Sequence, residues 1–331
     1  MAGTTNQVRN YPNLTFQPHP LTRNPHFQTI FSSLYRAKGT EIRQVAQEII
    51  LDAGESVRLQ GYYSRQSKGN AKGLVLLLHG WLGSINASYV LTIGEYLYRQ
   101  GYSIFRLNLR DHGDTHHLNP GPFRGDLLDE VFAATHRIAK LESNRPLHII
   151  GASLGGNFAL RLAWRSSQVP IPNLGHTITF CPVLNPYRST VVLDNGFWLY
   201  LAYFQRKWRK SMQKKQSAFP DLFDFSEEIA AATCMTMTEV FVRNHSPYPN
   251  ATAYFQRYTI TTEMMAVLRT PTTIITAADD PIVPIGDFFQ FYDLTPYLKI
   301  QVQPYGGHVG FIDFFPFQQW VCKAVLAILE S

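Results

Sequence analysis

The feature that most constrains the fold of this chain is a repeated alternation of short apolar runs with longer helix-compatible stretches. The apolar runs, rich in Val, Ile, Leu and Phe, cover residues 74–78, 103–107, 147–150, 177–181, 272–276 and 298–302. The helix-compatible stretches cover residues 89–99, 127–141, 154–164 and 318–329. Uninterrupted apolar runs of this length are typical of strands that are buried on both faces. We therefore predict an α/β protein with a mostly parallel sheet and helices on both of its faces.

Two segments depart from this alternation. Residues 48–51 and 57–63 predict an antiparallel hairpin at the sheet edge. Residues 182–269 carry helical patterns and loops but no clear strand, which indicates an inserted helical cap. The predicted organisation has three parts. Residues 1–40 form an N-terminal arm that packs on the core, residues 41–181 and 270–331 form the α/β core, and residues 182–269 form the cap.

Composition excludes several classes of protein. Hydrophobic residues make up 45% of the 331 residues and charged residues only 16%, which excludes a largely disordered chain. The N-terminus lacks the features of a signal peptide, and no apolar run approaches the roughly 18 residues that span a bilayer. The three cysteines form neither a CxxC pair nor a zinc-ligand spacing. We therefore expect a cytoplasmic protein with reduced, buried cysteines and no membrane span.

The positive charge of the chain is local. The formal net charge is +6, and residues 204–215 alone hold six Lys or Arg residues and no acid, so a distributed surface for nucleic acid is not expected. An apolar stripe at helical spacing predicts an amphipathic cap helix with the basic residues mostly on its other side; the stripe consists of Phe197, Leu201, Phe204, Trp208 and Met212.

This basic helix has two interpretations. It could make peripheral contact with anionic membrane surfaces. Alternatively, the acidic residues that follow it could neutralise it within the cap, and we favour this interpretation; those residues are Asp221, Asp224, Glu227 and Glu228.

A nucleophile elbow is predicted directly after the strand 147–150. There the sequence Gly-Ala-Ser-Leu-Gly places Ser153 between Gly151 and Gly155, and a helical pattern follows at once. The sharp turn holds its central residue in a strained conformation, so the flanking positions must lack bulky side chains. Ser153 would then present its hydroxyl at the carboxyl end of the sheet as a nucleophile.

A serine nucleophile needs a base and a carboxylate that orients the base. The strand 272–276 is followed by Asp279 and Asp280, and the strand 298–302 is followed by His308. Ligands of open α/β sheets bind past the carboxyl ends of the strands, which is where these groups lie. Adjacent residues leaving a strand point in different directions, so only one of the two aspartates faces His308.

An oxyanion site is expected beside the elbow. The strand 74–78 ends in His-Gly-Trp-Leu-Gly, which places a flexible turn after an early strand. The N–H groups of Trp81 and Leu154 form the natural donor pair for a tetrahedral oxyanion. His79 is interpreted as structural, because the later His308 has the chain position of the base.

Two further groups suggest chemistry but are given other roles. The loop that contains His112, His116, His117, Asp111 and Asp114 could suggest a metal site. The spacing of these residues matches no known metal-ligand motif. We therefore favour a polar loop at the rim of the site and expect no metal and no cofactor. A second candidate nucleophile, Cys181, follows a strand but lacks a small-residue elbow, which favours a buried packing role.

Three short motifs carry a resemblance to a known family. They are Asn-Pro-His-Phe-Gln-Thr at residues 24–29, Ala-Ser-Leu-Gly-Gly-Asn at 152–157, and Gly-Gly-His-Val-Gly-Phe at 306–311. With the chain order of serine, acid and histidine, they resemble the α/β-hydrolase superfamily and, within it, the YheT-like branch (abhydrolase type 4). The motifs span most of the chain except the cap.

The resemblance implies an eight-stranded α/β-hydrolase fold and a serine hydrolase acting on carboxylic esters. Members with an Asp-Pro-Ile-Val-Pro-like segment place the catalytic acid directly before the proline, which favours Asp280 over Asp279. Relatives commonly have an Arg-Gly-Cys-Gly-Gly-type turn after the strand 103–107, whereas this chain has Arg-Asp-His-Gly-Asp at 110–114, which alters the expected pocket wall. Eukaryotic members often begin with a membrane anchor, which we do not expect here.

The leading functional hypothesis is an esterase or lipase-like hydrolase. Ser153 would form an acyl-enzyme, His308 would act as base and then as acid, and Asp280 would orient the imidazole. The expected partner is a small-molecule ester with an apolar acyl chain. Acyl transfer to an alcohol shares the same first half-reaction and stays open, as does a non-catalytic binding protein on the same scaffold.

Overall fold

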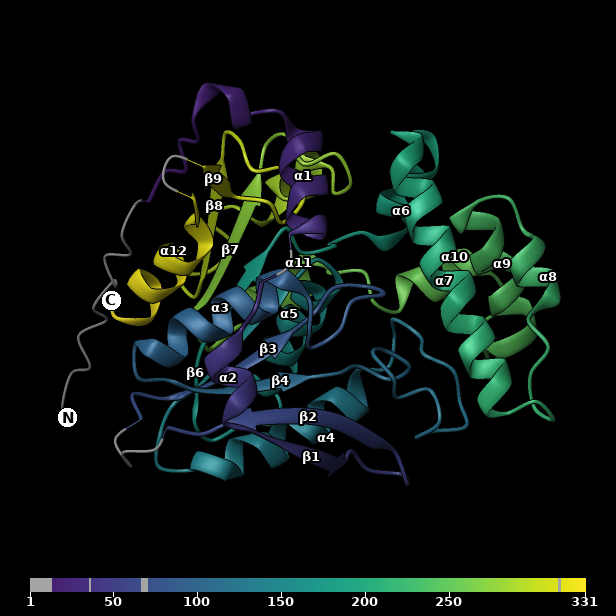
Figure 1. The fold of residues 1–331 in the computed structure, drawn as a ribbon, viewed down its shortest axis with the longest axis horizontal. Helices are drawn as coiled ribbons and strands as arrows, with labels where there is room; N and C mark the ends of the chain where they lie inside the picture. Colours follow the sequence, from purple (N-terminus) through teal and green to yellow (C-terminus); the bar gives the residue numbers. More distant parts are fainter. Residues whose placement is uncertain (1–13, 36, 67–70, 315–316) are drawn as a thin grey trace.

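The main element of the molecule is an eight-stranded sheet, seen in a computed structural model that describes residues 14–35, 37–66, 71–314 and 317–331 (Figure 1). The strand order is β1-β2-β4-β3-β5-β6-β7-β8. β2 is antiparallel to both of its neighbours, and all other pairs are parallel. The strands are β1 (Ala46–Asp52), β2 (Arg58–Ser64), β3 (Leu74–Leu78), β4 (Ser103–Leu107), β5 (Leu147–Ala152), β6 (Leu174–Phe180), β7 (Thr272–Ala277) and β8 (Leu298–Gln303).

The predicted mostly parallel sheet is therefore confirmed, and so is the edge hairpin, which β1 and β2 form with Asp52 opposite Arg58. The hairpin turn contains Glu55 and Ser56, both with positive φ. A second, two-stranded sheet pairs β9 (Ile312–Phe314) with β10 (Phe317–Gln319). No sequence pattern indicated these two strands, because each has only three residues.

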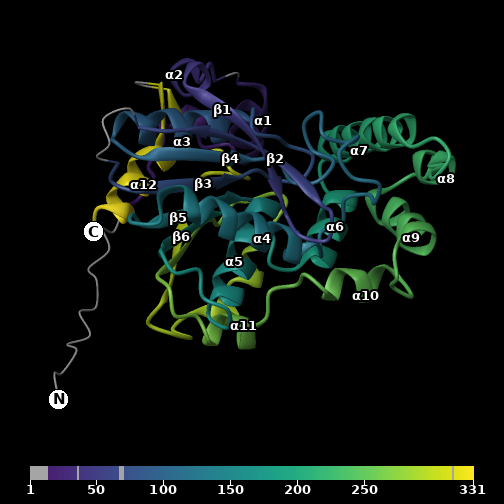
Figure 2. The same cartoon turned by 90° about the horizontal axis from the view of Figure 1, so that it is seen from below.

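Helices cover both faces of the sheet, so that β3, β4 and β5 are buried along their whole length. All five residues of β3 are buried, and they alternate between two apolar clusters. Leu74, Leu76 and Leu78 pack with α4 (Leu128–Ala139) and α5 (Leu154–Ser166), whereas Val75 and Leu77 pack with α3 (Ser88–Arg99) and α12 (Trp320–Leu329). Figure 2 shows these two helix layers on opposite sides of the strands. The alternation follows from the two-residue period of a strand.

Between β6 and β7 the chain forms six helices among the described residues; the first five lie to one side of the sheet in Figure 1, and the last, α11, lies beside α5. They are α6 (Pro186–Asn195), α7 (Trp198–Ala218), α8 (Ser226–Ala230), α9 (Cys234–His245), α10 (Ala251–Gln256) and α11 (Thr262–Ala266). The segment leaves the sheet at the carboxyl end of β6, at the edge that carries Ser153, and returns to the amino end of β7 at the opposite edge. Among the described residues, no helix combines the length and the apolar character that crossing a membrane requires.

The charges of α7 are arranged differently from the prediction. Lys215 is buried, and its Nζ donates to Asp111 Oδ1 at 2.9 Å, while Lys214 Nζ donates to Asp114 Oδ1 at 2.7 Å. The expected neutralisation by acids within the cap is therefore wrong for both lysines. α7 lies against the loop after β4, whereas two of the acids that follow α7 contact α9, where Glu227 pairs with Arg243 and Glu228 accepts from Asn244.

The N-terminal arm, described from residue 14 onward, packs on the core. It contains a short 3₁₀ turn, η1 (Pro20–Thr22), followed by α1 (Pro25–Leu34), and α2 (Thr40–Gln44) begins at the predicted boundary between the arm and the core. Phe16 and Ile42 are buried in the same apolar cluster as α3 and α12. Residues 1–13 of the predicted arm lie outside the described residues. Further 3₁₀ turns occur at η2 (Lys140–Glu142), η3 (Ile285–Asp287) and η4 (Phe289–Phe291).

Candidate active site

Ser153 occupies the sharp turn between β5 and α5. Its backbone has φ 55° and ψ −121°, a conformation that is unfavourable for a residue with a side chain. Its N–H donates to Phe180 O at 2.9 Å, which ties the turn to β6. A Cβ atom at Gly151 would lie 2.2 Å from Gly155 O, and one at Gly155 would lie 2.4 Å from Leu78 O. The close approach of these backbone segments therefore requires both glycines of the motif.

His308 lies in the loop after β8, with its ring between a hydroxyl and a carboxylate. Its Nε2 lies 2.9 Å from Ser153 Oγ, and its Nδ1 lies 2.8 Å from Asp280 Oδ2. The histidine side chain is 9% exposed and the aspartate side chain is fully buried. With Nδ1–H donating to the carboxylate, Nε2 has a free lone pair that can accept the serine proton. The structure thus brings together three residues that lie far apart in the sequence.

The two adjacent aspartates after β7 have different partners. Besides His308, Asp280 contacts its own turn, where its Oδ1 accepts from the N–H groups of Ile282 at 2.8 Å and Val283 at 2.9 Å. Asp279 instead accepts from Gly307 N at 2.9 Å, and burial raises the pKa of its carboxyl. Asp280 is therefore the carboxylate on the imidazole, and Asp279 holds the backbone of the histidine loop.

The two predicted oxyanion donors flank Ser153. Leu154 is the first residue of α5, and the turn that contains Trp81 approaches the serine so closely that a Cβ at Gly80 would lie 3.1 Å from Ser153 Cβ. Within the described part of the chain, neither the N–H of Trp81 nor that of Leu154 donates to another group. Both donors are therefore available to a bound oxygen, and their catalytic role stays a prediction.

The loop after β4 supports this turn. His112 Nδ1 lies 2.7 Å from Arg110 O, so Nδ1 donates, and Nε2 accepts from Leu82 N at 3.0 Å. Burial, together with the nearby charge of Lys207, lowers the pKa of His112 to about 4, so the ring is neutral at pH 7. His79 Nε2 accepts from Leu109 N at 3.2 Å, and burial lowers its pKa well below its usual value. Both histidines therefore stabilise the backbone of these loops through hydrogen bonds.

The other groups considered as chemical candidates also contact the protein itself. His116 Nε2 lies 2.8 Å from Ser211 Oγ. The Cys181 thiol contacts Gly307 O at 3.6 Å, and burial raises its pKa well above its usual value, so it remains protonated. All three cysteines are free and buried, as expected. Among the described residues, the only potential metal-binding group consists of Cys181, Asp280 and His308, two of which are already hydrogen-bonded to each other.

The N-terminal arm holds the histidine loop, a role that the sequence did not indicate. Thr29 Oγ1 accepts from His308 N at 2.9 Å and donates to Pro25 O at 2.7 Å. The Gln28 side chain is fully buried, donates to Ile312 O at 2.8 Å, and accepts from Ile312 N at 2.8 Å. The Asn-Pro-His-Phe-Gln-Thr motif therefore fixes the loop that carries His308. The available signal was the motif itself, which the sequence analysis singled out without giving it a role.

The Thr29 contact leads to a prediction about catalysis. Thr29→Val removes the acceptor for His308 N but keeps the volume of the side chain, so the imidazole should lose its alignment with Ser153. We expect kcat for an ester substrate to fall about 10- to 100-fold, because displacements near 1 Å have effects of this size. The measurement is steady-state kinetics with separate kcat and KM.

Thr29→Ser is the matched control, since it keeps the oxygen and should restore most of kcat. Thermal melts of both variants separate a positioning effect from a loss of stability. A Thr29→Val enzyme with the kcat of the wild type would contradict the positioning role.

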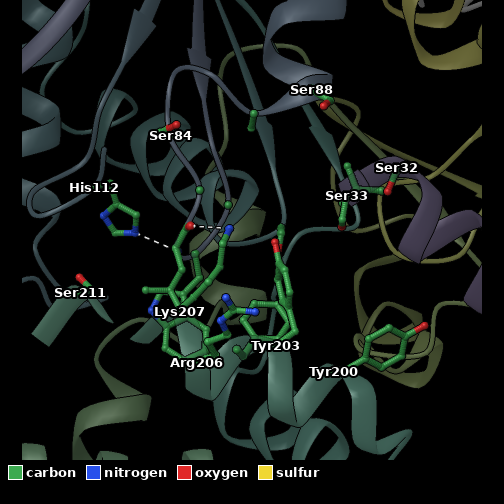
Figure 3. A pocket seen from close by; sticks show the side chains of 18 of the residues that line it. Ser32, Ser33, Ser84, Ser88, His112, Tyr200, Tyr203, Arg206, Lys207 and Ser211 are labelled. Atoms are coloured by element: carbon green, nitrogen blue, oxygen red, sulfur yellow. Dashed lines mark hydrogen bonds between the residues drawn. The ribbon is translucent and has the colours of Figure 1, made fainter. Parts of the chain in front are cut away.

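Two cavities meet at Ser153. The first, which we call the apolar slot, has a volume of about 110 Å³; among its lining residues are Trp81, Phe123, Leu154, Val183, Leu193, Phe204, Trp208, Phe241, Phe255 and Tyr258. The second, which we call the wide pocket, has a volume of about 960 Å³ and is partly shown in Figure 3; its lining includes Ser32, Tyr89, His112, Tyr200, Tyr203, Arg206, Lys207, Lys210 and His308.

A cluster of aromatic side chains separates the two cavities. The Trp81 ring stacks on Phe204 at 5.4 Å and meets Trp208 edge to face at 5.0 Å, as measured between ring centroids. Trp81 and Phe204 line both cavities. Because Phe204 and Trp208 belong to α7, the segment between β6 and β7 forms part of the wall on both sides of Ser153.

Comparisons with known proteins identify the family of the chain. The model of the family described as "Alpha/beta hydrolase family" matches residues 75–320. A protein of Escherichia coli (strain K12), named "Putative esterase YheT", is 23% identical over 294 residues, which cover 87% of this chain and 84% of that protein.

Solved structures show the same fold. The esterase Pf2001 of Pyrococcus furiosus gives a TM-score of 0.57 at 17% identity, covering 86% of this chain and 90% of that chain. Est1E of Butyrivibrio proteoclasticus, solved with bound ferulic acid, also gives 0.57, at 15% identity, over 86% of this chain and all of that chain. At these identities the likeness concerns the fold alone.

Proposed function

Because this chain belongs to the alpha/beta hydrolase family, as its motifs predicted, we propose that it is a serine hydrolase that cleaves carboxylic esters. The observation that carries the proposal is the hydrogen-bonded chain from Ser153 Oγ through His308 to Asp280. The esterase names of distant relatives support the same reaction class. The reaction uses only side chains and backbone N–H groups, so it requires no cofactor.

In the first half-reaction, Ser153 Oγ attacks the ester carbonyl carbon while His308 Nε2 takes the hydroxyl proton. The N–H groups of Trp81 and Leu154 donate to the oxyanion that forms. Asp280 accepts from Nδ1–H and stabilises the imidazolium. When the tetrahedral intermediate collapses, the bond to the leaving alcohol breaks, His308 protonates that alcohol, and an acyl-enzyme remains on Ser153.

In the second half-reaction, His308 deprotonates a water molecule, which attacks the acyl carbonyl, and the acid leaves as Ser153 regains its proton. An alcohol in the place of water would give acyl transfer with the same residues. We propose hydrolysis because every step it needs is supplied by this site and water.

Labelling with a fluorophosphonate probe tests the proposed function. The probe reacts with activated serines, so the wild-type protein should be labelled and peptide mapping should locate the label on Ser153. A folded protein that takes up no label and hydrolyses no ester would favour the alternative, a non-catalytic binding protein on the same scaffold.

The apolar slot predicts the acyl specificity of the enzyme. Each methylene that an acyl chain buries there contributes up to about 0.8 kcal/mol, which can be used at the reacting carbonyl. A dry cavity of about 150 Å³ holds a six-carbon ring, so a slot of about 110 Å³ should hold about four carbons beyond the carbonyl.

We therefore expect kcat/KM for p-nitrophenyl esters to rise from acetyl toward medium-length acyl chains and then level off. The measurement is kcat/KM for a series of esters with increasing acyl length, all assayed in the same buffer without detergent. A flat profile, or one that is highest for acetyl, would show that the slot does not bind acyl chains. Phe241→Trp, which should shorten the slot, is expected to move the maximum to a shorter chain.

A further inference from the structure

One wall of the wide pocket is strongly cationic. α7 contains six Lys or Arg residues and no Asp or Glu. Four of these cations line the wide pocket together with Ser153, namely Arg206, Lys207, Lys210 and Lys214. Figure 3 shows Arg206 and Lys207 beside Tyr203. The charge therefore lies within the cavity that reaches the proposed nucleophile.

Two of the four cations have structural partners. Lys207 Nζ donates to Leu82 O at 3.0 Å and lies over the Tyr203 ring. Lys214 pairs with Asp114. In contrast, Arg206 and Lys210 are exposed and make no hydrogen bond or ion pair with any described residue. These two cations therefore have no evident role in holding the fold.

The acids of the pocket balance only part of this charge, although the Asp114 carboxylate lies near enough to Lys210 for the two charges to attract each other. Among the described residues, its lining contains only two carboxylates, Asp111 and Asp114, and each is already paired with a lysine. Arg206 and Lys210 are four residues apart, so they share one face of α7 and repel each other. A bound anion would remove this repulsion.

We propose that Arg206 and Lys210 bind a phosphate group on the alcohol portion of the ester, so that the preferred substrates are acyl esters of phosphate-bearing alcohols. This inference rests on the proposed function. The apolar slot takes the acyl chain and the wide pocket takes the alcohol, because the two cavities meet at Ser153. Two neighbouring cations suit phosphate, which carries a charge of about −1.5 to −2 at pH 7 and accepts several hydrogen bonds.

The test compares two water-soluble esters with the same acyl group, hexanoylglycerol and hexanoylglycerol 3-phosphate. The quantity measured is the ratio of kcat/KM for the phosphate ester to that for the neutral ester. Using a ratio within each variant removes differences in the amount of folded enzyme. We expect a ratio well above one for the wild type, and a fall of about tenfold or more in the double variant Arg206→Gln, Lys210→Gln.

The matched control is the double variant Lys140→Gln, Arg145→Gln, which also removes one lysine and one arginine. Both positions are exposed and lie just before β5, near the amino ends of the parallel strands. Its ratio should stay within about twofold of the wild type if long-range attraction is minor at working ionic strength. Raising the salt concentration to about 1 M, where the Debye length is about 3 Å, should lower the wild-type ratio.

Calorimetric titration gives a readout that does not depend on turnover. Glycerol 3-phosphate should bind to the wild type and bind at least about tenfold more weakly to the Arg206, Lys210 variant. Inorganic phosphate is the second ligand; if it binds as tightly as glycerol 3-phosphate, the site recognises free phosphate rather than an alcohol.

Several outcomes would overturn the inference. These are a wild-type ratio near one, an equal fall of the ratio in both double variants, or an effect that appears only when vesicles containing phosphatidylserine are present, which would indicate membrane binding instead. Normal hydrolysis of the neutral ester with any of these results would leave the proposed function intact. Loss of fluorophosphonate labelling and of all ester hydrolysis would instead refute the proposed function, and the titration would then decide the phosphate site by itself.

Discussion

Replacing Ser153 with alanine should lower kcat for ester hydrolysis by about 10⁴- to 10⁶-fold. Loss of a serine nucleophile in enzymes of this chemistry has effects of this size, because the covalent route is removed and only binding and oxyanion stabilisation remain. Ser153 Oγ is the hydroxyl that lies 2.9 Å from His308 Nε2, so no other described serine can take its place without moving the imidazole.

The same variant should remain folded. Alanine keeps the Cβ atom at the position with φ 55°, so backbone strain at the turn is unchanged. Among the described residues, the lost hydroxyl makes one hydrogen bond, to His308. The measurement is kcat with a p-nitrophenyl ester, with a thermal melt as the test of folding. Ser143→Ala, at an exposed serine, is the matched control and should keep wild-type turnover. A folded Ser153→Ala protein with undiminished turnover would remove Ser153 from the mechanism.

The second large effect is expected at Asp280. Asp280→Asn should lower kcat by about 10⁴-fold, because an amide next to Nδ1 favours the wrong imidazole tautomer and no longer stabilises the imidazolium. The carbonyl oxygen of the asparagine can still accept from the N–H groups of Ile282 and Val283, so the turn should be preserved.

Asp279→Asn is the matched control for this variant. Asp279 contacts Gly307 N rather than the imidazole, and an asparagine oxygen can accept the same hydrogen bond. We expect a fall in kcat of no more than about tenfold, as for a residue that acts through its neighbour. If Asp279→Asn shows the larger loss, the role of orienting carboxylate passes to Asp279.

Much of the fold was predictable because the information is local. The short runs that become β3, β4, β5 and β7 are buried along their whole length, as expected for strands that are covered on both faces of the sheet. The elbow at Ser153 was also local, since a strand, two glycines and a helix follow one another within a few residues. To predict that Asp280 and His308 lie near Ser153, one more step was needed. The carboxyl ends of parallel strands lie at a common edge of the sheet, so residues that follow different strands come together there.

Contacts between distant segments could not be predicted in this way. The buried pair of Lys215 with Asp111 joins residues 104 positions apart, and the sequence favoured acids that were nearer along the chain. Sequence proximity was misleading here, because the direction in which α7 packs decides which carboxylate its lysine meets. The contact of Thr29 with His308 spans 279 residues and left no periodic signal.

The sequence by itself determined the class of sheet, the elbow that holds Ser153, and the set of residues available for acid–base chemistry, because strand period and turn sterics act over a few residues. Only the tertiary structure decided that Asp280 faces the imidazole while Asp279 faces the backbone, that α1 holds the histidine loop, and that an apolar slot and a cationic pocket meet at Ser153. These features depend on how helices and loops from distant parts of the chain pack around one sheet edge, and that packing is set by the whole core at once.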